Sequence, residues 1–291
     1  MKSVDPAKTE SRAFYRYMVN SVAPRPIALV STIDNESRVN LSPFSFFNYM
    51  GIDPPILAFA PNRRSGDSSE KDTILNLKEI PEAVVNLVDA DMVQQVSLAS
   101  SVYDRGVNEF QKAGFTALPA SLVRPPRVAE SLIQLECRTL EIIEKGTMSL
   151  VVAEVVMAHF SEKILDSKGQ IDPLKTSWVG RSGGNWYNLS DKNTLFEVPR
   201  PVLGIGIDAL PLSVQRSAIL TGNDLGMLGS LQLYPAADAV KQYRFDPIVQ
   251  ELRNQTNGVC ENFNELLHIR VKELLAAGNV EEALLAALQS H

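Results

Sequence analysis

PRPIALVSTIDNESRVNLSPFSFFN, residues 24–48, is the most informative segment of this chain. Residues 27–33 are short, apolar and rich in β-branched side chains, which is the composition of a buried strand. Asp34-Asn35 follows and favours a turn. Residues 40–48 then place serine hydroxyls among phenylalanine rings. Hydroxyl and backbone N–H groups suit phosphate oxygens, and rings suit the face of a flat heterocycle, so the segment is typical of a site for a planar, phosphorylated cofactor.

Core packing is the competing interpretation of the same segment. Phe44, Phe46 and Phe47 lie close together in a strand hairpin. Aromatic side chains dominate the energetics of protein cores, so such rings usually belong to a core. Composition alone favours packing over a cofactor site, and the choice between them depends on the rest of the chain.

The bulk composition is that of an ordinary globular protein. The chain has 291 residues, of which 45% are hydrophobic and 21% are charged. This length allows one large domain, or one domain of about 190 residues with an appendage. The net charge is −6, which argues against nucleic acid as a partner because phosphate backbones require a basic surface.

Few residues could form a disulfide framework or a metal site. Cys137 and Cys260 are far apart, and the chain has three histidines. We therefore expect neither a disulfide scaffold nor a bound metal. The first residues lack an apolar run of signal-peptide length, and no window approaches the roughly 18 apolar residues of a membrane-spanning helix. We expect a cytoplasmic protein with no membrane partner.

The hydrophobic pattern predicts an antiparallel barrel followed by helices. Strands are expected at 27–33, 39–47, 56–60, 83–88, 133–144 and 148–160, and helices at 6–20, 71–79 and 91–100. Lys145-Gly146 should turn the last two strands into a hairpin. Short strands without long alternating helices fit an antiparallel barrel rather than a doubly wound α/β sheet.

The character of the chain changes near Pro199-Arg200-Pro201. Helices are expected beyond it at 247–255, 262–277 and 280–289, with leucine and alanine at helical spacing. We therefore predict two domains, residues 1–198 and 199–291. The apolar stripes of the final helices are expected to pack against the barrel or a dimer partner; a lid over the site is the alternative.

Two further segments carry groups that could bind an anion. Lys71-Asp72-Thr73 opens a predicted helix, whose N–H groups together with the lysine charge suit an anion; simple capping by Ser69 or Asp72 would also explain this sequence. Gly180-Arg181-Ser182-Gly183-Gly184 supplies an arginine and allows close backbone approach, but an ordinary loop fits as well. Gly204-Ile205-Gly206 lacks the third glycine of a dinucleotide fingerprint.

Short motifs over roughly residues 10–190 resemble the flavin reductase-like family, the FMN-binding split barrels, in its flavoredoxin-type branch. The similar segments, in chain order, are Pro24-Arg25-Pro26, Val30-Ser31-Thr32, residues 40–47 (NLSPFSFF), Lys71-Asp72-Thr73, Asn108-Glu109-Phe110, residues 125–128 (PPRV), Leu135-Glu136-Cys137 and residues 180–187 (GRSGGNWY). Ala153 departs from the family pattern, which has glycine there. Packing rather than ligand contact is the expectation for the segment around Glu109.

The resemblance implies a mainly β fold, a split β-barrel of Greek-key type with peripheral helices, here followed by a helical C-terminal extension. It implies a homodimer with FMN at the subunit interface. It also implies an NAD(P)H-dependent oxidoreductase of flavin reductase type, in which FMN passes electrons to a small-molecule substrate or acceptor. The cofactor carries such chemistry, so no catalytic side chain is expected.

The same resemblance assigns residues to the cofactor. Those expected near the flavin ring are Ser31, Thr32, Ser45, Phe46, Phe47 and Asn48. Those expected at the phosphate and ribityl chain are Arg25, Lys71, Asp72, Thr73 and Arg181.

Three other functions stay open at this point. The protein could hold FMN tightly and reduce one specific organic substrate. It could be a non-enzymatic FMN carrier or sensor whose helical tail binds a partner. It could also be a structural barrel that has lost its ligand, although the serine-rich segment 40–48 argues against this.

Overall fold

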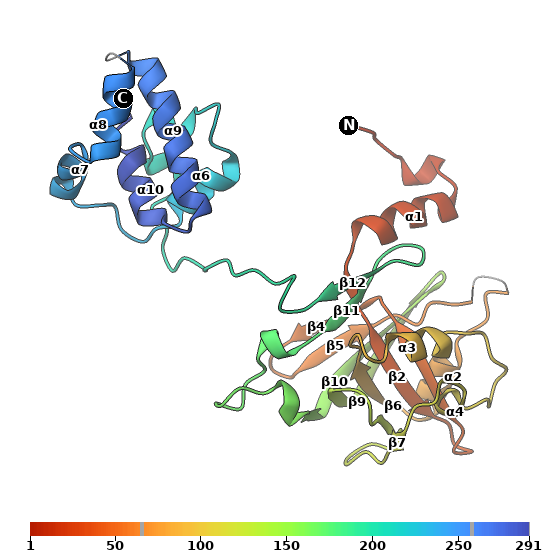
Figure 1. The fold of residues 1–291 in the computed structure, drawn as a ribbon. Coiled ribbons are helices and arrows are strands. Elements are labelled where there is room, and N and C mark those ends of the chain that lie inside the picture. Colours follow the sequence, from red (N-terminus) through yellow and green to blue (C-terminus); the bar gives the residue numbers. More distant parts are fainter. Residues whose placement is uncertain (65–66, 257–258, 291) are drawn as a thin grey trace. The chain divides into compact units, whose positions relative to one another are not determined.

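The computed structural model describes residues 1–64, 67–256 and 259–290 (Figure 1). The chain divides into two compact units, Met1–Phe196 and Glu197–His291, and each is described by itself. The assignment of two functional domains, 1–198 and 199–291, stays a prediction. Among the described residues, no helix combines the length and the apolar character needed to cross a membrane.

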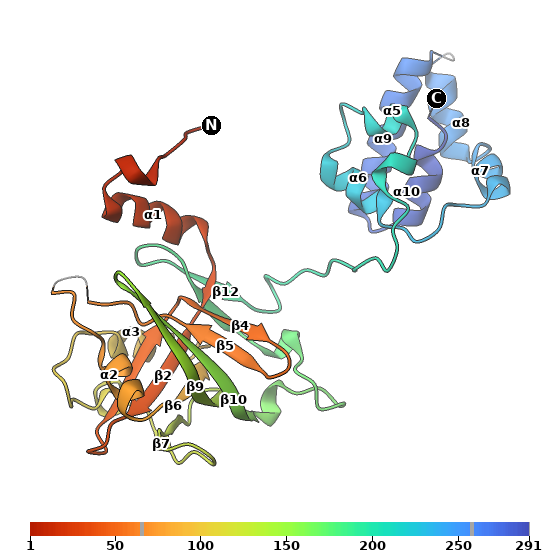
Figure 2. The same ribbon diagram turned by 180° about the vertical axis from the view of Figure 1, so that it is seen from behind.

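The first unit is built on a curled antiparallel sheet of seven strands, in the order β3-β2-β6-β9-β10-β5-β4 (Figures 1 and 2). The strands are β2 (Ala28–Ile33), β3 (Val39–Phe44), β4 (Phe47–Gly51), β5 (Ile56–Phe59), β6 (Glu82–Leu87), β9 (Ile133–Lys145) and β10 (Met148–Phe160). The predicted hairpin is confirmed: β9 and β10 pair from Lys145 and Met148 onward. Gly146 makes the turn at φ +61°.

The two edges of this sheet meet at Ser45 and Phe46. β3 and β4 lie at opposite edges, yet only these two residues separate them in the sequence. The three Cα steps from Phe44 to Phe47 span at most about 11 Å, so the sheet has to curl until its edges are close. The rings of Phe44 and Phe59 stack across this closure with centroids 5.9 Å apart. The single strand predicted over 39–47 is therefore wrong, because the chain crosses from one edge to the other within it.

Short strands and helices complete the first unit. β1 (Arg25–Pro26), β11 (Trp178–Arg181) and β12 (Tyr187–Ser190) form a second sheet, and β7 (Ala117–Leu118) pairs with β8 (Arg127–Val128). The α-helices are α1 (Ser11–Ser21), α2 (Asp72–Glu79), α3 (Val93–Ala99) and α4 (Glu109–Ala113), and the short 3-10 helices are η1 (Pro6–Lys8), η2 (Glu162–Ile164) and η3 (Pro173–Lys175).

Alternation along the strands gives the sheet two buried faces. On the inner face, Val30 and Phe59 pack with Ile74 of α2. On the outer face, Leu29 packs with Val96 of α3 and Phe110 of α4. These two layers fix the amino end of α2 beside the edge strand β3, which is where the candidate site lies.

The second unit is helical and has its own core. Its helices are η4 (Ile207–Ala209), α5 (Leu212–Gln215), α6 (Gly222–Gly229), α7 (Ala237–Tyr243), α8 (Pro247–Gln255), α9 (Cys260–Ala276) and α10 (Val280–Ala287). Leu228, Leu267 and Leu284 are fully buried together. We expected the apolar stripes of α9 and α10 to pack on the barrel or on a dimer partner. Instead, α9 and α10 pack against each other and against α6, and the three helices share one core.

The glycine motif at Gly204-Ile205-Gly206 serves backbone packing in this unit. A Cβ on Gly204 would lie 2.6 Å from the carbonyl oxygen of Gly229. The N–H of Ile205 donates to the carbonyl of Leu231 at 2.9 Å. The motif is thus explained by two segments that approach closely, and not by a dinucleotide site.

Candidate functional site

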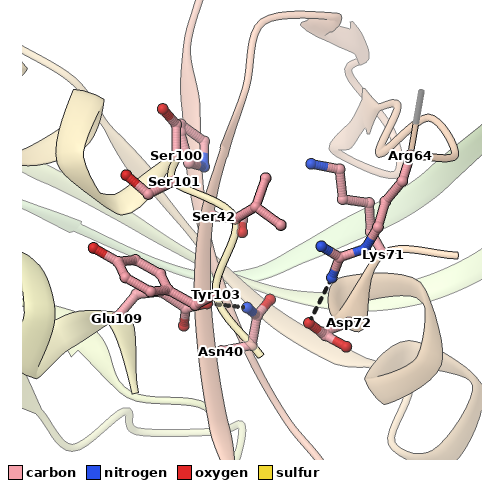
Figure 3. Close-up of a pocket in the computed structure, with 11 residues that line it drawn as sticks. Asn40, Ser42, Arg64, Lys71, Asp72, Ser100, Ser101, Tyr103 and Glu109 are labelled. Atoms are coloured by element: carbon pink, nitrogen blue, oxygen red, sulfur yellow. Dashed lines mark hydrogen bonds and ion pairs between the residues drawn. The ribbon is translucent and has the colours of Figure 1, made fainter. Parts of the chain in front are cut away.

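A small polar cavity of about 50 Å³ lies where the edge strand β3 meets the amino end of α2 (Figure 3). The residues that line it are Asn40, Ser42, Pro43, Arg64, Lys71, Asp72, Ser100, Ser101, Val102, Tyr103 and Glu109. Asn40 and Ser42 share one face of β3 because side chains alternate along a strand. Lys71 and Asp72, two of the predicted site residues, are among the residues that line this cavity.

Of the described cations that line the cavity, Lys71 is the one without an ion-pair partner. In the part of the chain that the structure describes, its ammonium makes no hydrogen bond or ion pair, and Figure 3 shows it pointing away from the Arg64–Asp72 pair. Burial, with the Arg64 guanidinium nearby, lowers the pKa of Lys71. An anion beside this amine would replace the water that it has lost and would favour its charged form.

The amino end of α2 adds further attraction for an anion. Lys71 occupies the position before the helix, and its side chain does not cap the first N–H groups of this described segment. Capping by Ser69 or Asp72, the alternative explanation of this sequence, is not seen among the described residues, where the Ser69 hydroxyl donates to Asp67 and Asp72 pairs with Arg64. Free N–H groups and the helix dipole both favour negative charge at such an end. Asp72, in the first turn, is neutralised by Arg64 at 3.0 Å.

Thr73 supports the cavity from behind. Its hydroxyl donates to Asn40 Oδ1 at 2.8 Å, and Asn40 Nδ2 donates to Glu109 Oε1 at 2.9 Å. The second oxygen of Glu109 accepts from the N–H of Leu41 at 2.9 Å. Burial raises the pKa of Glu109, while the hydrogen bonds from Leu41 and Asn40 oppose that rise. These three buried side chains hold the cavity wall in place.

Asn40 and Glu109 were missed as members of the site by sequence reasoning. Glu109 stands in a helix that was expected only to pack. The sequence offered one signal: Glu109 is a carboxylate among apolar residues that are expected to be buried. A buried charge requires hydrogen-bond partners, so this residue should have been expected to have some. Nothing local pointed to Asn40 as that partner, because 69 residues separate the two.

Ser31 and Thr32 are fully buried and do not reach the cavity. The Ser31 hydroxyl donates to the Pro126 carbonyl on the outer face of the barrel. Thr32 faces α2 and accepts a hydrogen bond from Asn76 Nδ2 at 3.1 Å. Both hydroxyls are thus engaged inside the protein.

A second group of predicted residues gathers at the barrel closure. Arg25 is 8% exposed, and its guanidinium donates to the carbonyls of Val19 at 2.6 Å and Val22 at 2.8 Å. It also donates to Ser45 Oγ at 3.4 Å and lies 5.7 Å from the Phe46 ring centroid. Arg25 therefore ties the end of α1 to the closure.

The remaining predicted residues flank this closure. Phe47 is half-buried and Asn48 is exposed on β4. Arg181, opposite Arg25 in the sheet register, donates to the Trp186 carbonyl at 3.1 Å and lies 4.4 Å from the Tyr187 ring centroid.

One strand connects the two groups. Ser42 lines the cavity, and Ser45 belongs to the closure at the end of the same strand. Three residues at about 3.3 Å each separate them by about 10 Å. The cavity and the closure therefore lie about 10 Å apart along β3.

Comparison with known proteins identifies the family and the fold. The Flavin reductase like domain matches residues 20–175. Uncharacterized protein BH2278 of Halalkalibacterium halodurans is 32% identical over 206 residues, which are 69% of this chain and 97% of that protein. A split barrel domain structure from Shewanella frigidimarina, 23% identical with a TM-score of 0.57, covers 66% of this chain and 94% of its own and supports the fold.

Two solved structures with higher identity have functional names. Nitrilotriacetate monooxygenase component B from Bacillus cereus has a TM-score of 0.64 and 26% identity, covering 68% of this chain and 98% of its own. The 2-nitrobenzoate 2-nitroreductase NbaA from Pseudomonas fluorescens has a TM-score of 0.61 and 30% identity, covering 68% and 96%. The predicted family and split barrel are confirmed: this chain belongs to the flavin reductase-like family and is a flavin-related oxidoreductase.

Proposed function

We propose that the protein binds FMN with its phosphate in the cavity beside Lys71, and that NAD(P)H supplies electrons which the flavin passes to a small-molecule acceptor. The observation that carries this proposal is a partly buried lysine that has no ion-pair partner among the described residues, stands at a helix end without a side-chain cap there, and shares the cavity with the Ser42 hydroxyl. The two carboxylates of the cavity do not oppose an anion strongly, because Asp72 is paired with Arg64 and Glu109 accepts two internal hydrogen bonds.

The size of the cavity supports a phosphate rather than the flavin ring. A volume of about 50 Å³ is far below the roughly 300 Å³ at which ligand pockets begin. We therefore assign the flavin ring to the region of Ser45, Phe46, Phe47 and Asn48, which begins about 10 Å from Ser42 along the chain. Phe46 is 38% exposed there, so an aromatic surface is available to a planar ligand.

A second copy of the chain would cover such a ring. Tyr49 and Met50 lie on β4 and Ile52 follows it; they are 54%, 63% and 88% exposed. Contiguous exposed apolar residues mark interaction sites, and most soluble oligomers are symmetric homodimers. We propose that this surface forms a homodimer interface next to the flavin. Light scattering of the purified protein measures its oligomeric state. Met50→Asp should yield monomers, whereas the control Leu122→Asp, at an exposed apolar residue outside this surface, should leave the dimer intact.

The side chains of the site bind and orient, and none of them needs to exchange a proton. A bound FMN would supply the hydride- and electron-transfer chemistry. Lys71 and the end of α2 hold the phosphate, while the Thr73–Asn40–Glu109 chain keeps the strand wall from moving. Arg25 keeps the closure and α1 together, so that the ring region has one fixed shape.

Anaerobic titration of the FMN-loaded protein with NADH and with NADPH tests this function. Loss of the visible flavin absorbance at one equivalent of donor is expected. A protein that binds FMN but is not reduced by either donor would refute the reductase proposal and would favour a carrier.

A further inference from the structure

A basic groove of about 680 Å³ lies between α1 and the segment that follows β5. Arg12, Tyr15 and Arg16 of α1 line one side, and Arg63 and Arg64 line the other. Positions 12, 15 and 16 share a helix face because residues three and four apart are neighbours. No acidic residue is found among the described residues that line the groove, although the whole chain carries a net charge of −6.

Among the residues that the structure describes, the side chains of two of these four arginines have no partner. Arg63 lies 3.5 Å from Glu70 and 3.6 Å from Glu144, and Arg64 pairs with Asp72. The guanidinium groups of Arg12 and Arg16 form neither ion pairs nor hydrogen bonds with any residue described, and both residues are exposed. A guanidinium presents five donors in a planar fork that matches phosphate oxygens.

The groove and the cavity described above have one lining residue in common. Arg64 lines both of them. A ligand with one phosphate beside Lys71 would therefore have a second, larger cationic surface within reach. FMN has one phosphate, so it would leave this surface unused.

We propose that the groove binds the adenosine diphosphate half of a dinucleotide, with Arg12 and Arg16 on its phosphates and Tyr15 against the adenine. The groove volume lies within the range of small-molecule pockets, and the Tyr15 side chain, 54% exposed, offers a ring face to a base. FAD and the nicotinamide dinucleotides share this moiety. The proposal deepens the flavin function proposed above and rests on it.

Adenosine 5′-diphosphate alone is the first probe, measured by calorimetry on the full chain. The test variant is the double change Arg12→Gln with Arg16→Gln. The matched control is Arg124→Gln with Arg138→Gln, which removes two exposed arginines elsewhere in the same unit. We expect the test variant to weaken ADP binding at least about tenfold and the control to leave it within about twofold. Both variants change exposed residues, so circular dichroism melting should match the wild type.

Two further measurements identify the source of the moiety. A loss of FAD affinity in the test variant, with FMN affinity unchanged, assigns the groove to the flavin dinucleotide. An increase in KM for NADPH or NADH, with kcat unchanged, assigns it to the nicotinamide dinucleotide. Lys71→Gln should instead weaken FMN and FAD equally, and its failure to do so would count against the flavin-phosphate proposal while the ADP result stands separately. No ADP binding by the wild type, or equal binding by test variant and control, overturns the groove proposal.

Discussion

Replacing Glu109 with glutamine should destabilise the barrel unit by about 2 kcal/mol. Its two carboxylate oxygens accept from Asn40 Nδ2 and from the N–H of Leu41, both at 2.9 Å. A glutamine amide offers one oxygen and one NH2 group, so one buried donor would face another donor. Losing a hydrogen bond to a charged group costs about 1.5–3 kcal/mol, and the easier burial of a neutral side chain offsets part of that cost.

Alanine at the same position should cost more, because both donors lose their acceptor. Two unpaired buried donors at about 1–3 kcal/mol each give roughly 4 kcal/mol. The free energy of unfolding should therefore be highest for the wild type, lower for Glu109→Gln and lowest for Glu109→Ala.

Urea unfolding followed by tryptophan fluorescence measures this without interference from the helical unit. Both tryptophans of the chain, Trp178 and Trp186, belong to the unit Met1–Phe196. Glu141→Gln is the control, since Glu141 is an exposed carboxylate on β9. A Glu109→Gln variant that unfolds within about 0.5 kcal/mol of the wild type would refute the claim that this carboxylate organises the cavity wall.

Three further outcomes follow from other parts of the molecule. Gly204→Ala should destabilise the helical unit by about 1–3 kcal/mol through overpacking, and so lower its thermal midpoint, because the new Cβ would lie 2.6 Å from the Gly229 carbonyl oxygen. Gly226→Ala, on α6, should stabilise that unit by up to about 1 kcal/mol, because its Cβ would have no described atom within 4 Å beyond its chain neighbours and its own helix backbone; equal shifts of the thermal midpoint in circular dichroism would contradict this. Burial alone would raise the pKa of Glu136, but hydrogen bonds from Ser121, His159 and Leu122 outweigh it, so the folded pKa is lower than the unfolded value. Its contribution to stability is thus present above the ordinary glutamate pKa of about 4.3 and is lost as the pH falls through the folded pKa. In Glu136→Gln, the free energy of unfolding measured in urea should therefore fall less steeply as the pH is lowered through this range. Burial raises the pKa of Cys137 to about 12, and Cys260 is exposed, so a thiol reagent should label one cysteine in native protein and two in denaturant, and two labels in native protein would show that Cys137 is accessible.

Local sequence patterns predicted the elements whose stability is local. The apolar run at 27–33 became β2, and the Lys145-Gly146 turn joined β9 to β10. The apolar face of α2 was equally visible, since Ile74 and Leu77 are spaced three apart and both are buried. In each case, the decisive contacts involve residues that are near in sequence or follow one simple period.

Features that depend on distant contacts could not be predicted. Alternation shows that Ser31 and Thr32 face opposite sides of a strand, but not that the Pro126 carbonyl and Asn76 cover both sides. The composition of residues 39–47 gives no sign that the barrel closes within them. The partner of the α10 stripe was also misjudged, because an apolar stripe defines a buried face without defining what buries it.

Among the cofactor residues, sequence reasoning identified the correct neighbourhood more readily than the individual roles. Lys71 and Asp72 line the cavity, whereas Thr73 lies behind it and Arg25 is bonded to the end of α1. A short motif specifies the residue types at a site, but the direction of each side chain is set by the strand and helix that carry it.

The most direct test of the central claim is the preference for FMN over riboflavin, measured as the ratio of their Kd values for wild type, Lys71→Gln and Lys78→Gln. The two flavins differ by the phosphate, so the ratio isolates its contribution to binding. Lys78 lies on the same helix but pairs with Glu70 and Glu144. We predict that Lys71→Gln reduces the ratio about tenfold or more while Lys78→Gln leaves it unchanged. An unchanged ratio in Lys71→Gln would contradict the assignment of the flavin phosphate to this cavity.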